Sequence, residues 1–494
     1  MTFRNPTYKE HGIVSPNKMA CTVCIMCLSL TLPLCPTPLW AQNNAQNEAQ
    51  KEASSQPTPS PTTSKVLSLS ECLQMALENN HRIVAAEAQR SAAESQVRSA
   101  KALYRPQLSI EASALYTSTD GTYDSGSGML PVFGAEGVPN GTQAYFPGIQ
   151  LDYEIGMIVS AGLKLEQPIY MGGKIKAGNE MAKLGEQIAQ QNIRLTKAEV
   201  KVETARAYAT MVQCKELTHT ARAYNALLQE LMRTVTKAHQ HGMKPKNDVL
   251  KVQVKLDESL LNIRKAENGL RLATLNLCYY TGLPMEAYQS VDVDTVLPTP
   301  TEVVEGQTAP QDVSSRPEWQ MLEQKSLLSE QQVKSAKAER LPQVGLMGQV
   351  GYTNGVELNG EKLIDGCSFM VGAQVTIPID LGHKSHKVRQ AKAEQLQVES
   401  ERADTNQRMM LEANQAANNW DEAMMEITMA EAQVASAEEN LRSSSKQYAS
   451  GKETLSDHLE AQTLWQQAQS ELIKARTNAF VRWMEYCKAT GQLE

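Results

Sequence analysis

QVRSAKA at residues 96–102, followed by PQL at 106–108, recurs with the same spacing as QVKSAKA at 332–338, followed by PQV at 342–344. Each copy predicts the end of a helix, a break at the proline and the start of a strand. A repeat of this length indicates two related halves, each built as one supersecondary unit. The sequence therefore predicts an internal duplication in which helices and strands recur in the same order.

Composition favours long helices over a compact enzyme core. The chain has 494 residues, only 5% of them aromatic, and Ala, Gln, Glu, Lys and Leu dominate, as is typical of long helices and coiled coils. Its length allows several domains or one very elongated one. The net charge of -7 gives no reason to expect a nucleic-acid partner.

Residues 1–41 are predicted to be a secretory signal peptide. Basic residues precede an apolar stretch at 19–34 that contains no acidic residue, and a cleavage position follows Ala41. The alternative is an uncleaved membrane anchor, but the stretch is short for a span and prolines interrupt its end. Residues 42–65, rich in Gln, Asn, Ser, Thr and Pro, are predicted to be a disordered linker.

Two repeats follow, at 66–282 and 313–494, joined by a Pro- and Val-rich connecting segment at 283–312. Each repeat is predicted to contain a helix, two strands and a pair of long helices. The first helix begins after Ser68, where Ser-x-x-Glu has cap chemistry, and runs to about Leu103.

The other elements follow from the periodicity and from the positions of Gly and Pro. Strands of about 9 to 11 residues, alternating apolar with polar or small side chains, are expected near 107–119, 155–167, 343–353 and 368–378. The segment 120–147 is predicted to be a long exposed loop. Helices are expected over 172–241, 247–280, 315–340 and 382–450, and a last helix is expected to end near 488.

The alternation in the strands has two physical explanations. A strand of this length with one apolar and one polar face suits a transmembrane β-barrel, whose outer face meets lipid and whose inner face meets water. A soluble antiparallel sheet with one face on a core gives the same pattern. The predicted signal peptide indicates that the chain is exported, which favours the explanation by a transmembrane β-barrel. Because lipid does not satisfy a free strand edge, four strands cannot span alone, and three copies are expected to share twelve strands.

From Leu67 to Gln492 the chain resembles the TolC-type outer-membrane efflux proteins. The resemblance rests on the duplicated Ala-Lys-Ala…Pro-Gln, on the strand-ending motifs at 167–169 and 377–382, and on the opening Leu69-x-x-x-Leu73-x-x-x-Ala76-Leu77-x-x-Asn80. It implies a mainly α fold with a four-strand contribution to a shared transmembrane β-barrel. It also implies that long antiparallel helices form a trimeric α-barrel in the periplasm.

The function that the resemblance implies is that of an outer-membrane exit duct. Such a duct serves a tripartite efflux or type I secretion system, through which small molecules or polypeptides leave passively. The implied partners are two further copies of the chain, a periplasmic adaptor protein, an inner-membrane transporter and outer-membrane lipid. No cofactor is implied.

The resemblance places functional residues at the two helix-turn-helix tips. Acids that ring the periplasmic entrance in the family fall on Asp457 and Glu460, which are spaced i and i+3 and therefore share a helix face. The alternative is two ordinary exposed acids. Polar links that lock the closed entrance fall on Tyr448 and Asp248.

One position of this lock departs from the family pattern. A basic residue is expected as the third partner, but Glu453 stands there, and Lys452 or Lys246 is the candidate replacement. The tips around Gly242 and Gly451 are where the adaptor is expected to dock.

No catalytic motif appears in its required context, whether nucleophile elbow, P-loop or paired acids, and enzyme activity is not expected. The His and Met residues near His241 and Met424 are interpreted as packing groups, so that no metal site is predicted. The rival interpretation is a structural or adhesive surface protein with coiled-coil stalks. Such stalks predict cleaner a/d heptads than this sequence contains.

Overall fold

The computed structural model describes residues 65–133, 135, 137–298 and 313–493. The predicted signal peptide and residues 42–64 of the predicted linker lie outside this part of the chain. So do residues 299–312 of the predicted connecting segment.

Helix formation begins at Ser68, as the sequence predicts. The Ser68 hydroxyl accepts a hydrogen bond from the Glu71 N–H at 3.3 Å, and the Glu71 carboxylate accepts one from the Ser68 N–H at 2.9 Å. This reciprocal cap satisfies two backbone donors at the start of α3 (Leu69–Asn79).

The single helix expected up to Leu103 is in fact two helices. Asn80 leaves the helical conformation, with φ of -73° and ψ of 121°, and its side chain caps the next helix by accepting from the Arg82 N–H at 2.9 Å. The second helix, α4 (His81–Ala102), therefore starts immediately after α3. The periodicity missed this break because Asn80 interrupts the helical pattern at a single position only.

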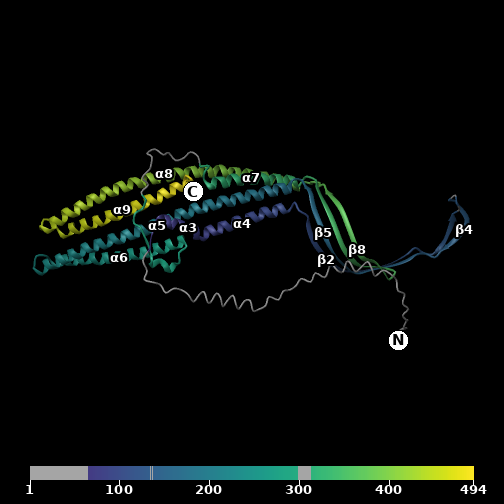
Figure 1. Cartoon of the computed structure of the whole chain (residues 1–494), viewed down its shortest axis with the longest axis horizontal. Helices are drawn as coiled ribbons and strands as arrows, with labels where there is room; N and C mark the ends of the chain where they lie inside the picture. Colours follow the sequence, from purple (N-terminus) through teal and green to yellow (C-terminus); the bar gives the residue numbers. More distant parts are fainter. Residues whose placement is uncertain (1–64, 134, 136, 299–312, 494) are drawn as a thin grey trace, which may run out of the picture. The chain divides into compact units, whose positions relative to one another are not determined.

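The four predicted strands form one antiparallel sheet of order β2-β5-β7-β8 (Figure 1). Their bounds are β2 (Gln107–Asp124), β5 (Gln150–Met171), β7 (Gln343–Leu358) and β8 (Glu361–Thr376). They contain 18, 22, 16 and 16 residues, more than the alternation predicts. The additional residues include Gly, Thr and Asp, which weaken the pattern but still pair with the neighbouring strand.

The register sorts the side chains onto two faces, as the alternation predicts. One row across the four strands consists of Ile110, Leu163, Val350 and Phe369. The next row, on the other face, consists of Glu111, Gly162, Gly351 and Ser368. Ile110 is 80% and Phe369 83% exposed. The described part of the chain therefore leaves the apolar face of the sheet uncovered.

The loop predicted at 120–147 is wrong, because most of it is strand. β2 extends into it as far as Asp124, and β3 (Gly128–Phe133) then pairs antiparallel with β4 (Pro139–Phe146). The prediction relied on Gly and Pro as breakers. Here Gly137 takes a φ of 72° in the turn, and Pro131 lies in a two-stranded ribbon, where both strands are edges and tolerate proline.

Helices make up most of the rest of the described chain. α5 (Lys174–Gln240) and α8 (His383–Ala449) contain 67 residues each, about 100 Å at 1.5 Å per residue. α6 (Lys246–Thr281) and α9 (Leu455–Ala489) return along them, and α7 (Pro317–Ala338) is the second repeat's counterpart of α4. These bounds agree with the predicted helices to within a few residues.

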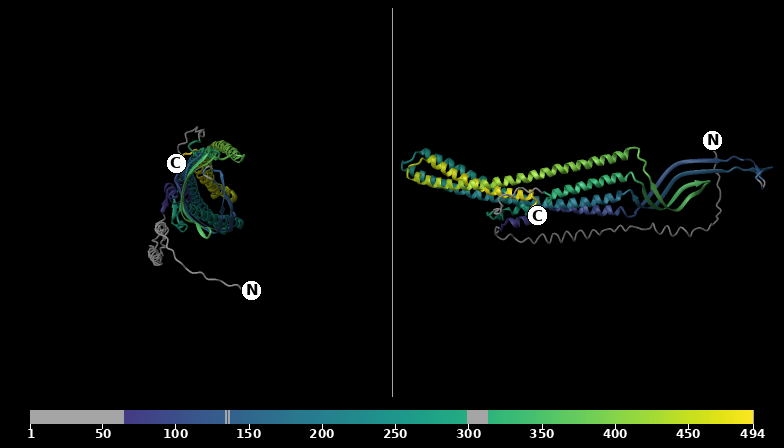
Figure 2. Two further views of the ribbon diagram at one scale, coloured as in Figure 1. Left: turned by 90° about the vertical axis from the view of Figure 1, so that its right-hand side faces the viewer. Right: turned by 90° about the horizontal axis from the view of Figure 1, so that it is seen from above.

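Each of the two longest helices changes neighbours along its length (Figures 1 and 2). Near the sheet, α5 packs beside α4 and α7, and Arg194 donates to Gln320 of α7 at 3.2 Å. Farther along, α5 packs beside α6 and α9, and Arg222 donates to Glu267 of α6 at 2.9 Å. α8 packs first beside α7 and then beside α9. Helices of the first repeat therefore pack directly beside helices of the second, since α5 contacts both α7 and α9.

A hydrophobic core forms where the middle of α5 meets two short strands. β1 (Lys65–Leu67) pairs in parallel with β6 (Val291–Val293), which follows the 3-10 helix η1 (Met285–Gln289). The Tyr208 hydroxyl donates to the backbone oxygens of Leu67 at 3.3 Å and Asp294 at 3.1 Å. Burial raises the pKa of Tyr208 to about 12. The predicted connecting segment therefore contributes β6 to this core. The predicted linker contributes its last residue, Lys65, which begins β1.

The two repeats end in the same way. Gly282 after α6 and Gly491 after α9 have φ of 73° and 74°, a left-handed conformation that favours glycine. A Cβ at Gly282 would lie 2.6 Å from the Asn79 Cβ, and one at Gly491 would lie 2.7 Å from the Ser315 Oγ. The end of each helix pair thus packs tightly against its own repeat, at Asn79, the last residue of α3, and at Ser315, just before α7.

Candidate functional site

The two predicted tips are tight turns between helices. α5 ends at Gln240 and α6 begins at Lys246, and α8 ends at Ala449 and α9 begins at Leu455. Gly242 and Gly451 take φ of 73° and 71° in these turns, and both are exposed. No neighbouring atom lies within 4 Å of where a Cβ would stand at either glycine. The turns therefore present open backbone at the end of the helices.

The two tips of one chain pack against each other. A cluster of buried side chains joins α5 and α6 to α9, and it consists of Tyr224, Leu228, Leu231, Val235, Val252, Leu455 and Leu459. Polar contacts supplement it, since the Lys251 ammonium donates to the Ser456 hydroxyl at 3.2 Å. A movement of one tip relative to the other would therefore have to break apolar contacts at the end of the bundle.

Tyr448 lies at the centre of this contact. Its ring stacks on the His458 imidazole, with centroids 5.0 Å apart and an interplanar angle of 4°. The Lys244 Nζ lies 5.2 Å from the centroid of the Tyr448 ring, within cation–π range. Burial, and secondarily the negative charge of Asp248, raise the pKa of the Tyr448 hydroxyl. Asp248 is thus close enough for its charge to act on the Tyr448 hydroxyl, and the cation over the Tyr448 ring is Lys244.

His458 is a buried polar residue that sequence reasoning did not select. Its Nδ1 is 2.9 Å from the Ser444 hydroxyl, and its Nε2 is 3.1 Å from the Gln462 side-chain nitrogen. Burial lowers the pKa of His458, while the carboxylate of Glu453 acts in the opposite direction. Its position between Leu455 and Leu459 is the sequence signal that could have indicated burial.

Asp457 and Glu460 are both exposed on the first turns of α9. Asp457 also has a structural role, because its carboxylate accepts from the Thr454 hydroxyl at 2.7 Å and from the Thr454 N–H at 3.4 Å, completing a capping box. Glu460 lines a groove of about 500 Å³ between α6 and α9, together with Lys251 and Lys255. Asp457 and Glu460 are therefore both accessible to solvent, and Asp457 also caps the start of α9.

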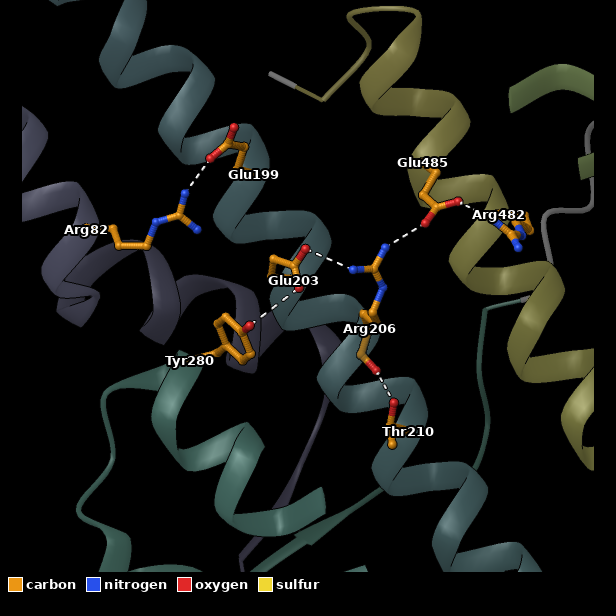
Figure 3. Close-up of polar contacts among 8 residues, drawn as sticks. All are labelled: Arg82, Glu199, Glu203, Arg206, Thr210, Tyr280, Arg482 and Glu485. Atoms are coloured by element: carbon orange, nitrogen blue, oxygen red, sulfur yellow. Dashed lines mark hydrogen bonds and ion pairs between the residues drawn. The ribbon is translucent and has the colours of Figure 1, made fainter. Parts of the chain in front are cut away.

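A charged cavity of about 660 Å³ lies between helices of the two repeats. Figure 3 shows Arg206 of α5 donating to Glu203 at 2.9 Å and to Glu485 of α9 at 2.6 Å. Arg82 of α4 pairs with Glu199 of α5 (Figure 3), and both residues line the cavity. Of these ion pairs, the one between Arg206 and Glu485 ties the first repeat to the second. The sequence could not indicate this pair, since Arg206 and Glu485 are 279 positions apart.

Within residues 65–298 and 313–493, apart from positions 134 and 136, no group of three or more His, Cys, Asp or Glu is arranged to hold a metal ion. Among the helices that the structure describes, none has a stretch long and apolar enough to cross a membrane.

The described chain consists mainly of two repeats of long antiparallel helices joined to a sheet whose apolar face is uncovered. The family model for outer membrane efflux proteins matches residues 72–283 and 311–492 of this sequence. The chain therefore belongs to the outer membrane efflux protein family. Its members are channels rather than enzymes.

Solved structures with a similar fold include three outer-membrane proteins. VceC from Vibrio cholerae matches with a TM-score of 0.67 at 18% identity, over 86% of this chain and 96% of that one. CusC matches with a TM-score of 0.69 at 16% identity, over 88% of this chain and 95% of that one. The CmeC channel of Campylobacter jejuni matches with a TM-score of 0.68 at 18% identity, over 89% of this chain and 90% of that one. No match was found among curated protein sequences. The protein is located in the outer membrane, with its helical part in the periplasm.

Proposed function

We propose that this protein is the exit duct of a tripartite efflux or type I secretion system, in which three copies share one β-barrel. The observation that carries the proposal is the unfinished sheet. In the described part of the chain, β2 and β8 each pair on one side only, so that both edges of the sheet are open. In an outer-membrane protein such edges must be paired, because lipid cannot satisfy backbone hydrogen bonds.

Strand direction allows the copies to close the sheet. β2, β5, β7 and β8 are antiparallel throughout, so that β8 of one copy and β2 of the next would also run antiparallel. Three copies would then give a closed barrel of twelve strands, within the size range of known outer-membrane barrels. The row of Ile110, Leu163, Val350 and Phe369 would face lipid, and the row that contains Glu111 would face a water-filled lumen.

The tips are proposed to form the gate of this duct. Tyr448, Asp248 and Lys244 would act as the lock, since they lie together where the two helix pairs meet. Three copies of Asp457 and Glu460 would ring the periplasmic entrance with carboxylates, which favours cations over anions. The exposed turns at Gly242 and Gly451 would receive a periplasmic adaptor, and an inner-membrane transporter would supply the energy. Movement through the duct itself would be passive.

Conductance in planar lipid bilayers tests this proposal. Purified protein should insert and carry a stable, cation-preferring current, and Asp457→Asn with Glu460→Gln should reduce the preference for cations. Asparagine at 457 keeps an oxygen for the helix cap, so that the variant changes charge with little effect on folding. Folded protein that inserts and carries no current would contradict the duct and favour a structural surface protein.

A further inference from the structure

A second cavity, of about 560 Å³, lies where the polar face of the sheet meets the first turns of α5. Gln107, Glu166 and Met347 pair across β2, β5 and β7 and line it from the sheet. Gly178 and Met181 line it from α5. The cavity is therefore formed within a single copy of the chain, on the face that would line the lumen of the proposed barrel.

The lining combines apolar side chains with neutral hydrogen-bonding groups. Met171, Ile175 and Met181 contribute apolar surface, and the amides of Gln343 and Gln374 contribute donors and acceptors. A pocket that is mostly apolar, with a few polar groups that fix orientation, is the usual form of a small-molecule site. The volume falls within the range of about 300 to 1,000 Å³ that is typical of drug-sized ligands.

The charged residues at the cavity are already neutralised. Glu166 pairs with Lys164, 2.9 Å away, and Lys174 pairs with Glu339, 3.1 Å away. A charged ligand would have to leave its hydration shell without gaining a free counter-charge, which is unfavourable. An uncharged ligand meets no such cost, so the cavity selects against net charge.

Three methionines make the cavity adaptable. Met171, Met181 and Met347 all line it, and their unbranched thioether side chains adopt several rotamers at little cost. Surfaces of this kind accept ligands of different shape by repacking. The lining therefore fits a class of molecules rather than one compound.

We propose that this cavity binds drug-sized, uncharged amphipathic molecules as they pass from the helical part of the duct into the barrel. The inference rests on the proposed function, because it requires the polar face of the sheet to line the conducting lumen. Three copies would place three such sites around the lumen, at the level where strands give way to helices.

Gly178 offers a direct test, because it lines the cavity and no neighbouring atom lies within 4 Å of a Cβ built on it. Gly178→Phe would fill the cavity without a backbone clash. Gly185→Phe is the matched control, since Gly185 lies two turns farther along α5, has equally open space around it and does not line the cavity. Met347→Trp fills the cavity from β7, with Gln349→Trp on the same face of that strand as its control.

Two readouts use the uncharged probe N-phenyl-1-naphthylamine. Fluorescence titration of the purified protein in detergent, against a protein-free detergent blank, should show a saturable component in the wild type and in both controls. In the two cavity-filling variants the apparent Kd should rise about tenfold or more. In planar bilayers the probe should reduce the wild-type current saturably, and this block should be lost in Gly178→Phe and kept in Gly185→Phe.

The two readouts separate failure of this inference from failure of the proposed function. Normal current in the wild type, without saturable probe binding, would overturn the inference and leave the duct intact. Equal binding by Gly178→Phe, Met347→Trp and their controls would also overturn it. Saturable binding that the cavity-filling variants abolish, in a protein that carries no current, would support the cavity as a ligand site while contradicting the duct.

Discussion

The imidazole ring of His458 lies flat against the phenol ring of Tyr448, with centroids 5.0 Å apart and planes inclined by 4°. His458 is in the first turns of α9, and Tyr448 is in the last turn of α8. The stack therefore crosses the turn at Gly451 and holds the two helices of this tip together. Lys244, from the other tip, covers the Tyr448 ring and extends the contact to α5 and α6.

Acidification should loosen this tip. Burial lowers the pKa of His458 below its ordinary value, whereas an unfolded tip has the ordinary pKa of about 6.5. The contribution of His458 to the stability of the folded tip is therefore fully present above the pKa of the unfolded state. It is lost as the pH falls below that pKa, because the unfolded state then binds more protons. Hydrogen exchange should show weaker protection of residues 441–460 at about pH 5.5 than at about pH 7.5.

The pH effect should belong to His458 alone. His458→Gln keeps a hydrogen-bonding side chain without a group that titrates in this range, and it should flatten the pH dependence of protection. His241→Gln changes an exposed histidine at the other tip and should leave that dependence unchanged. A wild-type tip whose protection does not vary over this pH range would exclude His458 as its cause.

Removing the Tyr448 ring should favour the open tip. Tyr448→Leu loses both the stack on His458 and the contact with Lys244, and an aromatic pair contributes about 1 kcal/mol beyond its buried area. The equilibrium between closed and open tips should shift about fivefold towards open, and single-channel current should rise. Tyr448→Phe keeps the ring and should change the current less. Equal currents in the two variants would show that the ring does not hold the gate.

Charge at the entrance should control block by divalent cations. In Asp457→Asn with Glu460→Gln, the concentration of a divalent cation that halves the current should rise several-fold, because the proposed ring would lose its carboxylates. Glu471→Gln, an exposed acid farther along the same helix, is the control and should leave block unchanged. Identical block in the double variant and the wild type would show that Asp457 and Glu460 do not line the entrance.

Gly282→Ala should destabilise the protein. The residue has a φ of 73°, and the new Cβ would meet the Asn79 Cβ at 2.6 Å. We expect a loss of about 1 to 3 kcal/mol in the free energy of unfolding, from backbone strain and steric conflict together. Gly185→Ala, in the interior of α5 with open space around it, should instead gain about 0.5 to 1 kcal/mol. Chemical denaturation of both variants measures the difference.

The fold could be predicted largely because its signals are local. The repeated Ala-Lys-Ala…Pro-Gln marks the same helix-to-strand junction twice, at Ala102 and Ala338, and the long helices carry their own periodicity and stop signals. The hairpin β3–β4 was missed for the opposite reason. Its Gly and Pro residues suggest a loop locally, and only pairing between 128–133 and 139–146 makes them strands.

The candidate site was predicted less completely, because its contacts join distant residues. The sequence placed Tyr448 and Asp248 at the tips through a family pattern, but it could not show that Lys244 reaches the Tyr448 ring from another helix pair. It also could not show that His458 is buried beneath that ring. Such contacts depend on how two helix hairpins pack, and no local pattern records that packing.

The central claim is that separate copies of the chain complete one barrel by joining β8 of one copy to β2 of the next. Native mass spectrometry of the detergent-purified protein counts the copies in each particle directly. The account predicts three copies per particle, which dissociate to monomers only when the strands unfold. A folded, stable monomer, or a particle with any other number of copies, would contradict it.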